Sequence, residues 1–207
     1  MTLLFRLLRQ SLVGLVLLVG LTVLLGVAYP LAIWGIGRLD ADSAEGSPRV
    51  VRGCVAGSAL LGVDPKAPSD APDPYFHART VGSGDDAFAP GSPAAGLPSN
   101  QGPNSEALAR WIAKRKHDVA EREGVPESAV PPDATTGSGS GLDPDISPAY
   151  AAIQVARVAK ANGKQADEVR KLVEQHTKGR QLGFLGEPRV NVGELNAALG
   201  LRPPNCG

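Results

Sequence analysis

The hydrophobic positions divide the chain into one long segment without charges and a remainder in which apolar and polar residues alternate. Residues 10–37 contain no Asp, Glu, Lys or Arg and are rich in Leu and Val. As a helix this segment would be about 42 Å long, whereas the hydrocarbon core of a bilayer is about 30 Å thick. The apolar region of a cleaved signal peptide is shorter, about 7 to 15 residues. The pattern therefore predicts a retained transmembrane helix.

The charges that flank this segment predict its orientation. Arg6 and Arg9 precede it, whereas the residues that follow it are mainly acidic. Because Lys and Arg accumulate on the cytoplasmic side of a span, we expect residues 1–9 to form a cytoplasmic stub. Residues 38–207 would then form one extracytoplasmic domain. The chain would be a single-pass protein of the cell membrane, in contact with the lipid bilayer.

The exterior part begins with a strand pattern and continues as a long irregular stretch. Residues 49–61 are rich in β-branched side chains and interrupted by Gly, which predicts one or two strands with tight turns. Residues 62–103 contain six Gly and eight Pro, a density that excludes a regular helix. Such a stretch is either functional or partly disordered. We expect a loop that covers or binds a partner, with Tyr75 and Phe76 either anchoring it there or joining the local core.

A first exterior helix is predicted at 104–123, where apolar or long side chains recur at three- and four-residue steps. Asn104 is placed to cap its start, and Gly124, followed by Pro126, is typical of a helix end. The inward face would carry Leu108, Trp111, Ile112, Arg115 and Val119.

The C-terminal part predicts a helical hairpin. A Ser-Pro pair at 147–148 is a strong helix start, and this helix would run to Asn162. A second helix is expected from 165 to 177, and the two would pack as an antiparallel pair. The inward residues would be Ala152, Ile153, Val155, Ala156 and Ala159 on the first helix, and Val169, Leu172 and Val173 on the second.

The last segment completes the expected fold. A turn and a strand are predicted over 181–190, and Asn191 and Glu194 have the spacing of a capping box for a short terminal helix. The fold class is therefore α+β. A single N-terminal transmembrane helix would precede one small α/β domain, which has a long Gly/Pro-rich loop and a C-terminal helical hairpin.

The charge balance excludes some partners. The chain has 21 basic and 21 acidic side chains, so its composition does not favour nucleic-acid binding. Without Arg6 and Arg9, the exterior part keeps 19 basic and 21 acidic side chains, a net charge of −2. This charge is too small to concentrate cations at physiological salt. We therefore expect a role in assembly or gating rather than electrostatic steering.

Several short motifs suggest chemistry that the surrounding sequence does not support. Thr80–Gly84 resembles the carbonyl-lined filter of potassium channels, but such a filter needs several copies at membrane depth. The Gly-Ser-Gly-Ser-Gly run at 137–141 lacks the Lys of a phosphate loop, and Gly stands where a nucleophile elbow needs Ser. The histidines His77, His117 and His176 have no second ligand at metal spacing. We assign no catalytic residue and no metal site.

The two cysteines leave one covalent question open. Cys54 and Cys206 would both lie outside the cytoplasm, where a disulfide can form. Such a bond would tie the first strand region of the domain to its tail. Cys206 is close to the chain end, where fraying opposes a fixed contact. Both the bonded and the free state therefore remain open.

Six ordered segments together match the pattern of one known family. They are Gly57–Gly62, Tyr75–Arg79, Thr135–Pro148, Gln154–Lys160, Gly183–Val192 and Glu194–Asn196. With these segments the chain resembles the C subunits (KdpC) of the bacterial Kdp potassium-transporting ATPase. The resemblance covers the whole chain, including the N-terminal span. The sequence departs from the family within the Gly/Pro-rich stretch, where Val63 replaces the usual Gln.

The resemblance implies a non-catalytic subunit of a P-type ATPase complex that transports potassium. Its partners would be a potassium-translocating subunit, an ATP-hydrolysing subunit and a small single-span subunit. It also implies a catalytic chaperone that raises the ATP affinity of the hydrolysing subunit. The chain itself lacks the Asp-Lys-Thr-Gly motif and a Walker signature, so we expect no enzyme activity of its own. ATP is implied by the resemblance alone, and the predicted orientation places the domain across the membrane from it.

Two hypotheses of different classes follow. In the first, the chain is an accessory transport subunit whose span packs against the pump and whose domain covers the outer mouth of the ion pathway or locks subunits together. In the alternative, the chain is a membrane-anchored exterior hydrolase or binding module. That module would use Ser138, Ser140, Asp143 or Asp145.

Overall fold

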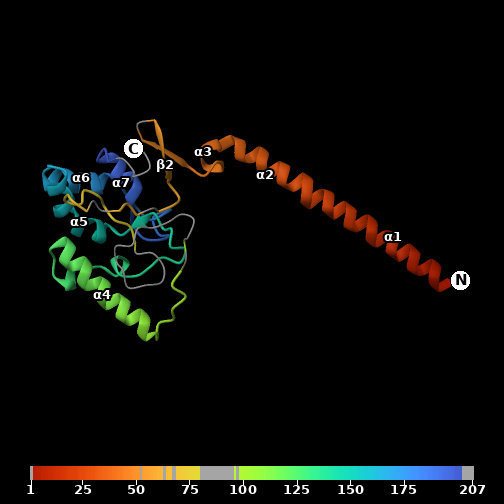
Figure 1. Cartoon of the computed structure of the whole chain (residues 1–207). Coiled ribbons are helices and arrows are strands. Elements are labelled where there is room, and N and C mark those ends of the chain that lie inside the picture. Colours follow the sequence, from red (N-terminus) through yellow and green to blue (C-terminus); the bar gives the residue numbers. More distant parts are fainter. Residues whose placement is uncertain are drawn as a thin grey trace. The chain divides into compact units, whose positions relative to one another are not determined.

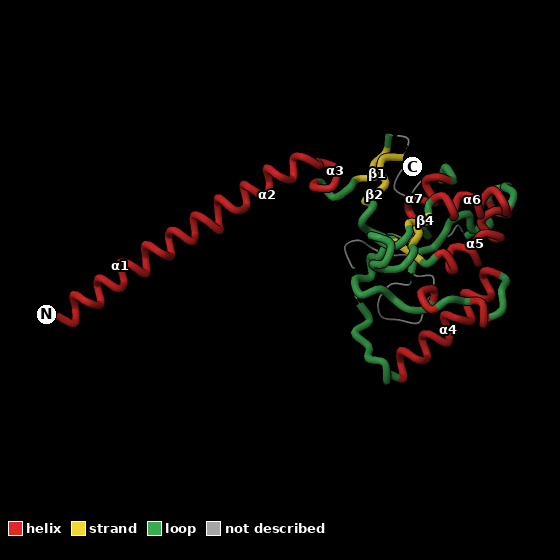
Figure 2. The backbone as a smooth tube through the Cα atoms, turned by 180° about the vertical axis from the view of Figure 1, so that it is seen from behind, coloured by secondary structure: helices red, strands yellow, loops and turns green. Residues whose placement is uncertain are grey.

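A computed structural model describes residues 2–51, 53–62, 64–66, 69–79, 96 and 98–201. The chain consists of two compact units, Met1–Ser47 and Pro48–Gly207. The first is helical, and the second is a mixed domain with two small sheets (Figures 1 and 2). The predicted fold class is therefore confirmed.

The first unit is a long apolar helix interrupted by one wide turn. It comprises α1 (Thr2–Val23), a π-helical turn (Leu24–Ala28) and α2 (Tyr29–Gly37), then a 3-10 turn (Arg38–Asp40) and α3 (Ala41–Ala44). Among the described residues, the stretch Leu3–Ala44 is the one long and apolar enough to cross a membrane. The helix extends past both ends of the predicted segment 10–37.

Pro30 accounts for the wide turn in this helix. Proline has no backbone N–H to donate and its ring crowds the preceding carbonyls. In the turn before it, Tyr29 donates its N–H to the Leu24 carbonyl, five residues back.

Near the far end of the helix, the Arg38 guanidinium lies 5.4 Å from the Trp34 ring centroid and 3.0 Å from a Glu45 carboxylate oxygen.

The domain begins with two strands, where the sequence predicts one or two. β1 (Pro48–Val51) and β2 (Cys54–Ser58) are antiparallel, with a register shift between Arg49 and Val50. Gly53 has φ of 82° in the connecting turn, a conformation that glycine adopts at little cost. Outward-facing valines leave part of this hairpin exposed.

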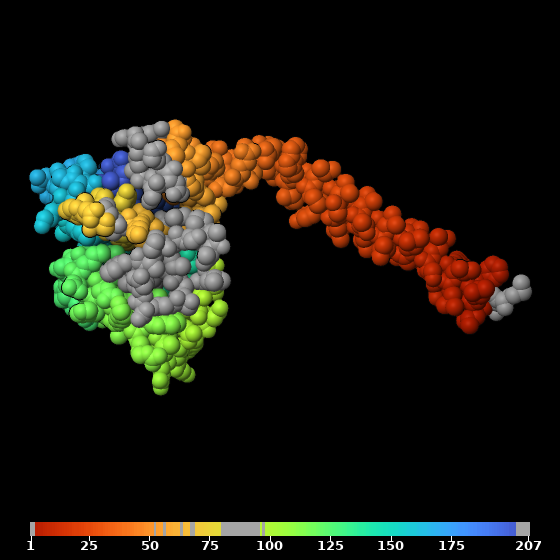
Figure 3. All heavy atoms as spheres, viewed as in Figure 1, coloured from red at the N-terminus to blue at the C-terminus, as the bar shows by residue number. Residues whose placement is uncertain are grey.

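Helix α4 (Glu106–Glu123) confirms the first predicted exterior helix, with one correction at its start. The N-cap is Ser105, not Asn104, and its hydroxyl accepts the Leu108 N–H over 3.2 Å. At the other end Gly124 has φ of 66°, as expected of a helix-ending glycine. Two 3-10 turns follow, Glu127–Ala129 and Pro132–Ala134. Helix α4 lies at the opposite end of the domain from α6 and α7, and its N-terminal part protrudes there (Figures 1 and 3).

The predicted helical hairpin is present as α5 (Pro148–Ala161) and α6 (Ala166–Gln175). Ser147 caps α5 by accepting the Tyr150 N–H over 3.0 Å. The second helix ends two residues earlier than expected, because Thr177–Lys178 pairs into a sheet as β4.

The inward face of α5 agrees with the prediction at Val155 and Ala159 and differs at Ala152 and Ala156, whereas that of α6 agrees throughout. Ala152 and Ala156 are exposed, and Ile153 is half-buried. Alanine is small enough for either the buried or the exposed face of a helix, so these two positions were assigned to the wrong face. The buried residues of α5 are Tyr150, Ala151, Gln154, Val155, Val158 and Ala159, and those of α6 are Val169 and Val173, with Leu172 packed against them.

A second small sheet has the strand order β3-β5-β4, where β3 is Asp145–Ile146 and β5 is Arg189–Asn191. Both pairings are antiparallel. The short helix α7 (Val192–Ala198) follows β5 directly. The Asn191 side chain accepts the Glu194 N–H over 3.0 Å, which is the forward half of the predicted capping box.

The core of the domain lies between the α5/α6 hairpin, α4, the second sheet and α7. Phe76 is fully buried in it, whereas Tyr75 is half-buried, so Phe76 belongs to the local core. The central members are Phe76, Val119, Ala134, Ile146, Tyr150, Val155, Val158, Val169, Val190 and Leu195.

The described part of 62–103 has neither helix nor strand, as its Gly and Pro content predicts. Thr80–Gly84 and Cys206 lie outside the described residues. Cys54 is disulfide-bonded, which agrees with the bonded alternative of the two that the sequence left open.

Candidate functional site

The backbone of residues 73–78 is held in place by hydrogen bonds to side chains from distant elements. Asn196 of α7 accepts the Phe76 N–H over 2.8 Å and donates to the Phe76 carbonyl over 2.9 Å. Gln154 of α5 does the same for His77, over 2.8 Å and 3.1 Å. Each side-chain amide thus pairs with the backbone N–H and the carbonyl of one residue, as a neighbouring β-strand would. We call residues 73–78, with the side chains that bind them, the backbone clamp.

Carboxylates hold the clamp from the other side. The Asp64 carboxylate accepts the Ala78 N–H over 2.6 Å and lies 2.8 Å from His77 Nδ1. His77 Nε2 lies 2.6 Å from an Asp73 carboxylate oxygen. Because both ring nitrogens face carboxylates, the imidazole is suited to carry two protons.

The surroundings shift the pKa values of both members of the His77–Asp73 pair. Burial of His77 by itself lowers its pKa, but attraction to and hydrogen bonding with Asp64, and the hydrogen bond to Asp73, outweigh this and raise the pKa overall. Burial of Asp73 opposes its ionisation, yet the hydrogen bond and charge of His77, with the charge of Arg157, lower its pKa. The ion pair is therefore favoured near neutral pH.

An ion-pair network extends the clamp to α4. Arg157 contacts an Asp73 carboxylate oxygen over 3.1 Å and a Glu123 carboxylate oxygen over 2.9 Å. Glu123, whose side chain is fully buried, also binds Arg122 over 2.6 Å. Arg122 donates to the Tyr150 hydroxyl over 3.1 Å. Burial raises the pKa of Tyr150 to about 12, so this phenol stays protonated.

This network is internal and has the character of a structural unit. His77 is only 4% exposed, and Gln154 is fully buried. The charged side chains of the network each face a partner of opposite charge within the domain. The arrangement fixes the chain course, and nothing in it presents a reactive group to solvent.

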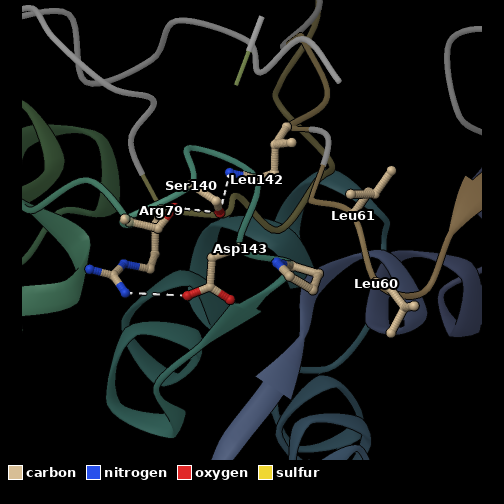
Figure 4. Close-up of a pocket in the computed structure, with 9 residues that line it drawn as sticks. Leu60, Leu61, Arg79, Ser140, Leu142 and Asp143 are labelled. Atoms are coloured by element: carbon tan, nitrogen blue, oxygen red, sulfur yellow. Dashed lines mark hydrogen bonds and ion pairs between the residues drawn. The ribbon is translucent and has the colours of Figure 1, made fainter. Parts of the chain in front are cut away.

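The Gly/Ser run lines a hollow of about 440 Å³ at the surface (Figure 4). Arg79 and Asp143 face one another on one side of it, and Leu60 and Leu61 lie on the other. The Leu142 carbonyl accepts the Gly62 N–H over 2.7 Å, which joins the two walls. The full lining is Leu60, Leu61, Arg79, Ser138, Gly139, Ser140, Leu142, Asp143 and Pro144.

A Cβ atom at Gly62 would collide with the Asp143 backbone. Only glycine therefore allows the segment after β2 to approach the Gly/Ser run so closely. This gives a physical reason for the glycine that closes the Gly57–Gly62 segment.

Arg79 organises the Gly/Ser run from within the hollow. Its guanidinium donates to the Gly137 carbonyl over 3.0 Å and lies 3.2 Å from the Asp143 carboxylate. It also reaches the Thr136 carbonyl and hydroxyl over 3.4 Å each. No role for this arginine was predicted, because its partners lie 57 to 64 positions away in the sequence.

The structure brings three of the four residues of the hydrolase alternative into this lining, but it gives them structural tasks. Ser138 accepts the Gly141 N–H over 2.8 Å, and Ser140 accepts the Leu142 N–H over 3.1 Å. Asp143 is bound to Arg79. Asp145 lies in the next hollow, paired with Arg189 over 3.0 Å.

A serine nucleophile also needs a base within hydrogen-bond reach. Among the described residues that line the hollow there is no histidine. His77 is enclosed in the backbone clamp, and the other two histidines lie in α4 and at the end of α6. The described part of the chain also holds no group of three potential metal-binding side chains.

The structural role of the clamp residues was not predicted, although the sequence contains one signal for it. Gln154 and Arg157 are polar residues on the otherwise apolar inner side of α5. A polar residue at such a position must have a buried partner. The identity of that partner was not encoded in any local pattern.

Comparison with known proteins identifies relatives along almost the full length. A family model described as "KdpC: K+-transporting ATPase, c chain" matches residues 11–200. The KdpC subunit of a potassium-transporting ATPase from Kineococcus radiotolerans is 45% identical over 194 residues, 94% of both chains. That of Rhodopseudomonas palustris is 48% identical, covering 90% of this chain and 94% of its own. That of Mycobacterium tuberculosis is 43% identical, covering 92% and 97%.

Proposed function

The chain belongs to the KdpC family of potassium-transporting ATPase subunits, and from this premise we propose that it is a non-catalytic accessory subunit that stabilises the assembled complex. Its partners are the potassium-translocating, ATP-hydrolysing and small single-span subunits. Its span packs against their helices, and its domain locks subunits together or covers the outer mouth of the ion pathway.

The observation that supports an assembly role is that the buried polar groups of the domain bind one another. Glu123 binds Arg157, and His77 binds Asp73, inside the domain rather than in a cleft. The serines of the surface hollow accept backbone N–H groups, and the described lining of that hollow contains no histidine. A domain of this kind offers a fixed shape, which suits a partner surface better than a reaction.

We further propose that the domain lies outside the cytoplasm. Arg6 and Arg9 at the start of the helix support a cytoplasmic N-terminus. Trp34 and Arg38, stacked at the other end, have the amphipathic character of an interfacial anchor. Residues 38–207 would then be on the side from which potassium enters.

A role as catalytic chaperone can be combined with this topology if it acts through conformation. A subunit that binds one state of the hydrolysing subunit more tightly shifts its population toward that state. If that state also binds ATP better, the affinity for ATP rises without any contact between the domain and the nucleotide. We propose this indirect route for the rise in ATP affinity.

Gentle detergent purification of the tagged full-length chain, expressed with its neighbouring genes, tests the proposal. Co-purification of a P-type ATPase subunit and a multi-span potassium-translocating subunit is expected. Deletion of the chain should weaken potassium uptake at low external potassium and raise the KM for ATP of the remaining complex. Recovery of the chain alone, with unchanged uptake in the deletion strain, would refute an accessory role.

A further inference from the structure

A short turn between β4 and β5 presents apolar side chains to solvent. Within it Leu182 is 83% exposed, Phe184 68% and Leu185 47%. None of the three belongs to the core or packs against it. We call residues 181–186 the apolar knob.

The knob has a fixed backbone despite its exposure. Gln181 and Leu185 form a two-way bridge, with each N–H donating to the carbonyl of the other over 2.9 Å. The Phe184 N–H donates to the Gln181 carbonyl over 3.2 Å. The turn therefore presents its apolar side chains from a fixed backbone before any partner arrives.

One residue of the knob adopts an uncommon conformation for its type. Leu182 has φ of 52°, in the left-handed region that glycine enters more readily. Its neighbour Gly183 has φ of 82°. The chain thus keeps a large apolar side chain at a position where glycine would be less strained, although that side chain makes no contact with the core.

We propose that the apolar knob inserts into an apolar pocket on the exterior surface of another subunit of the ATPase. This inference rests on the proposed function and names a docking element for it. A rigid projection of Leu182 and Phe184 matches the preorganised hydrophobic anchors that dominate protein interfaces. Polar residues at its base, Arg180 and Glu187, form the rim that excludes water.

The charges around the knob favour a protein pocket over a lipid surface. Loops and helices that bind anionic lipids combine apolar side chains with unneutralised Lys or Arg. Here each basic side chain close to the knob in sequence has an acidic partner in the described structure. The pairs are Arg180–Glu187 at 2.7 Å, Lys178–Glu194 at 3.1 Å and Arg189–Asp145 at 3.0 Å.

The size of the knob argues against a second copy of the chain as its partner. Its three exposed side chains offer on the order of 400 Å², about half of what each partner contributes to a standard interface. This area is small for association between free molecules. It suffices for a chain held beside its partner by a transmembrane helix, because tethering raises the effective concentration.

Photo-crosslinking in the assembled complex tests the inference. The full-length tagged chain with Phe184→p-benzoylphenylalanine is expressed with the other subunits and irradiated in membranes. The matched control carries the same replacement at Val55, a side chain of similar exposure, 66%, in the β1–β2 hairpin. We expect Phe184 to form a covalent adduct with another ATPase subunit. Adducts only with lipid or with a second copy, or no adduct although the complex is recovered, would overturn the inference.

A substitution provides the second readout. Phe184→Asp should reduce recovery of the other subunits about fivefold or more, as expected for loss of an interface anchor. Val55→Asp should reduce it less than twofold. Both variants should keep the melting temperature of the domain, because both side chains are exposed. Normal recovery with Phe184→Asp would refute the inference, whereas failure of the unaltered chain to recover any subunit would refute the proposed function as well.

Discussion

The Gln154 side-chain amide binds both backbone groups of His77, accepting from its N–H over 2.8 Å and donating to its carbonyl over 3.1 Å. Gln154→Met keeps the size of the side chain but leaves two buried backbone groups unsatisfied. We expect a loss of about 2–4 kcal/mol in the free energy of unfolding, measured by urea denaturation. Gln175→Met, at an exposed position on α6, should change it by less than about 0.5 kcal/mol. Equal stability of the two variants would show that the backbone clamp contributes nothing.

The His77 ion pairs predict a stability that falls on the alkaline side. The folded-state pKa of His77 is raised above its unfolded value of about 6.5. The contribution of His77 to the free energy of unfolding is therefore complete below about pH 6.5, and it is lost as the pH rises through the raised pKa. Denaturation between pH 6 and 9 should show this fall in the unaltered chain. His77→Gln should be less stable at pH 6, and its curve should be flatter over the same range.

Asp73 predicts the opposite behaviour in acid. Its pKa is lowered in the folded state, so its contribution is present above its ordinary pKa of about 3.9 and is lost as the pH falls through the lowered value. Asp73→Asn should remove part of the acid sensitivity measured between pH 5 and 2. An unchanged acid transition in this variant would contradict the ion-pair assignment.

Glu123 predicts a larger stability loss than other glutamates of α4. Its buried carboxylate binds Arg122 and Arg157, and Glu123→Gln removes this shared negative charge, which leaves Arg157 with Asp73 as its carboxylate partner. Removing one partner of such a buried network costs about 3 kcal/mol, to be read from the shift in the urea midpoint. Glu121→Gln, on the exposed side of the same helix, is the control and should be nearly neutral.

Arg79 should determine the order of the Gly/Ser run. Lysine cannot reproduce the several directed N–H groups by which Arg79 reaches Gly137, Thr136 and Asp143. In Arg79→Lys we expect amide hydrogen exchange in residues 136–143 to become about tenfold faster, with little change in α5. Arg110→Lys on the exposed face of α4 should leave both regions unaltered. Unchanged protection of 136–143 in Arg79→Lys would mean that the loop holds its own shape.

The elements of this fold were predictable where the information is local. The predicted helix start at Ser147 and the predicted helix end at Gly124 were correct, because a cap depends on residues within one turn. The inner face of α5 was wrong at Ala152, since small side chains fit either face. The apolar span needed only length and the absence of charge.

The candidate site was less predictable because its partners are remote in sequence. Asn196 and Phe76 are 120 positions apart, and no periodicity links a side-chain amide to a particular backbone group. Arg79 is likewise defined by a loop 57 positions further along the chain. The sequence patterns excluded a phosphate loop and a nucleophile elbow in the Gly/Ser run and kept its serines only for the alternative hydrolase or binding module. The structure shows that these serines stabilise turns.

The contact between Asn196 and Phe76 also has a consequence for the order of events during synthesis. Asn196 is near the last described residues of the chain, and the backbone of Phe76 acquires that partner only when α7 has been made. Contacts of such long sequence separation form late and slow folding. The domain therefore completes its core only after α7 has left the ribosome, and a nascent chain that ends before α7 lacks the side chain that binds the Phe76 backbone.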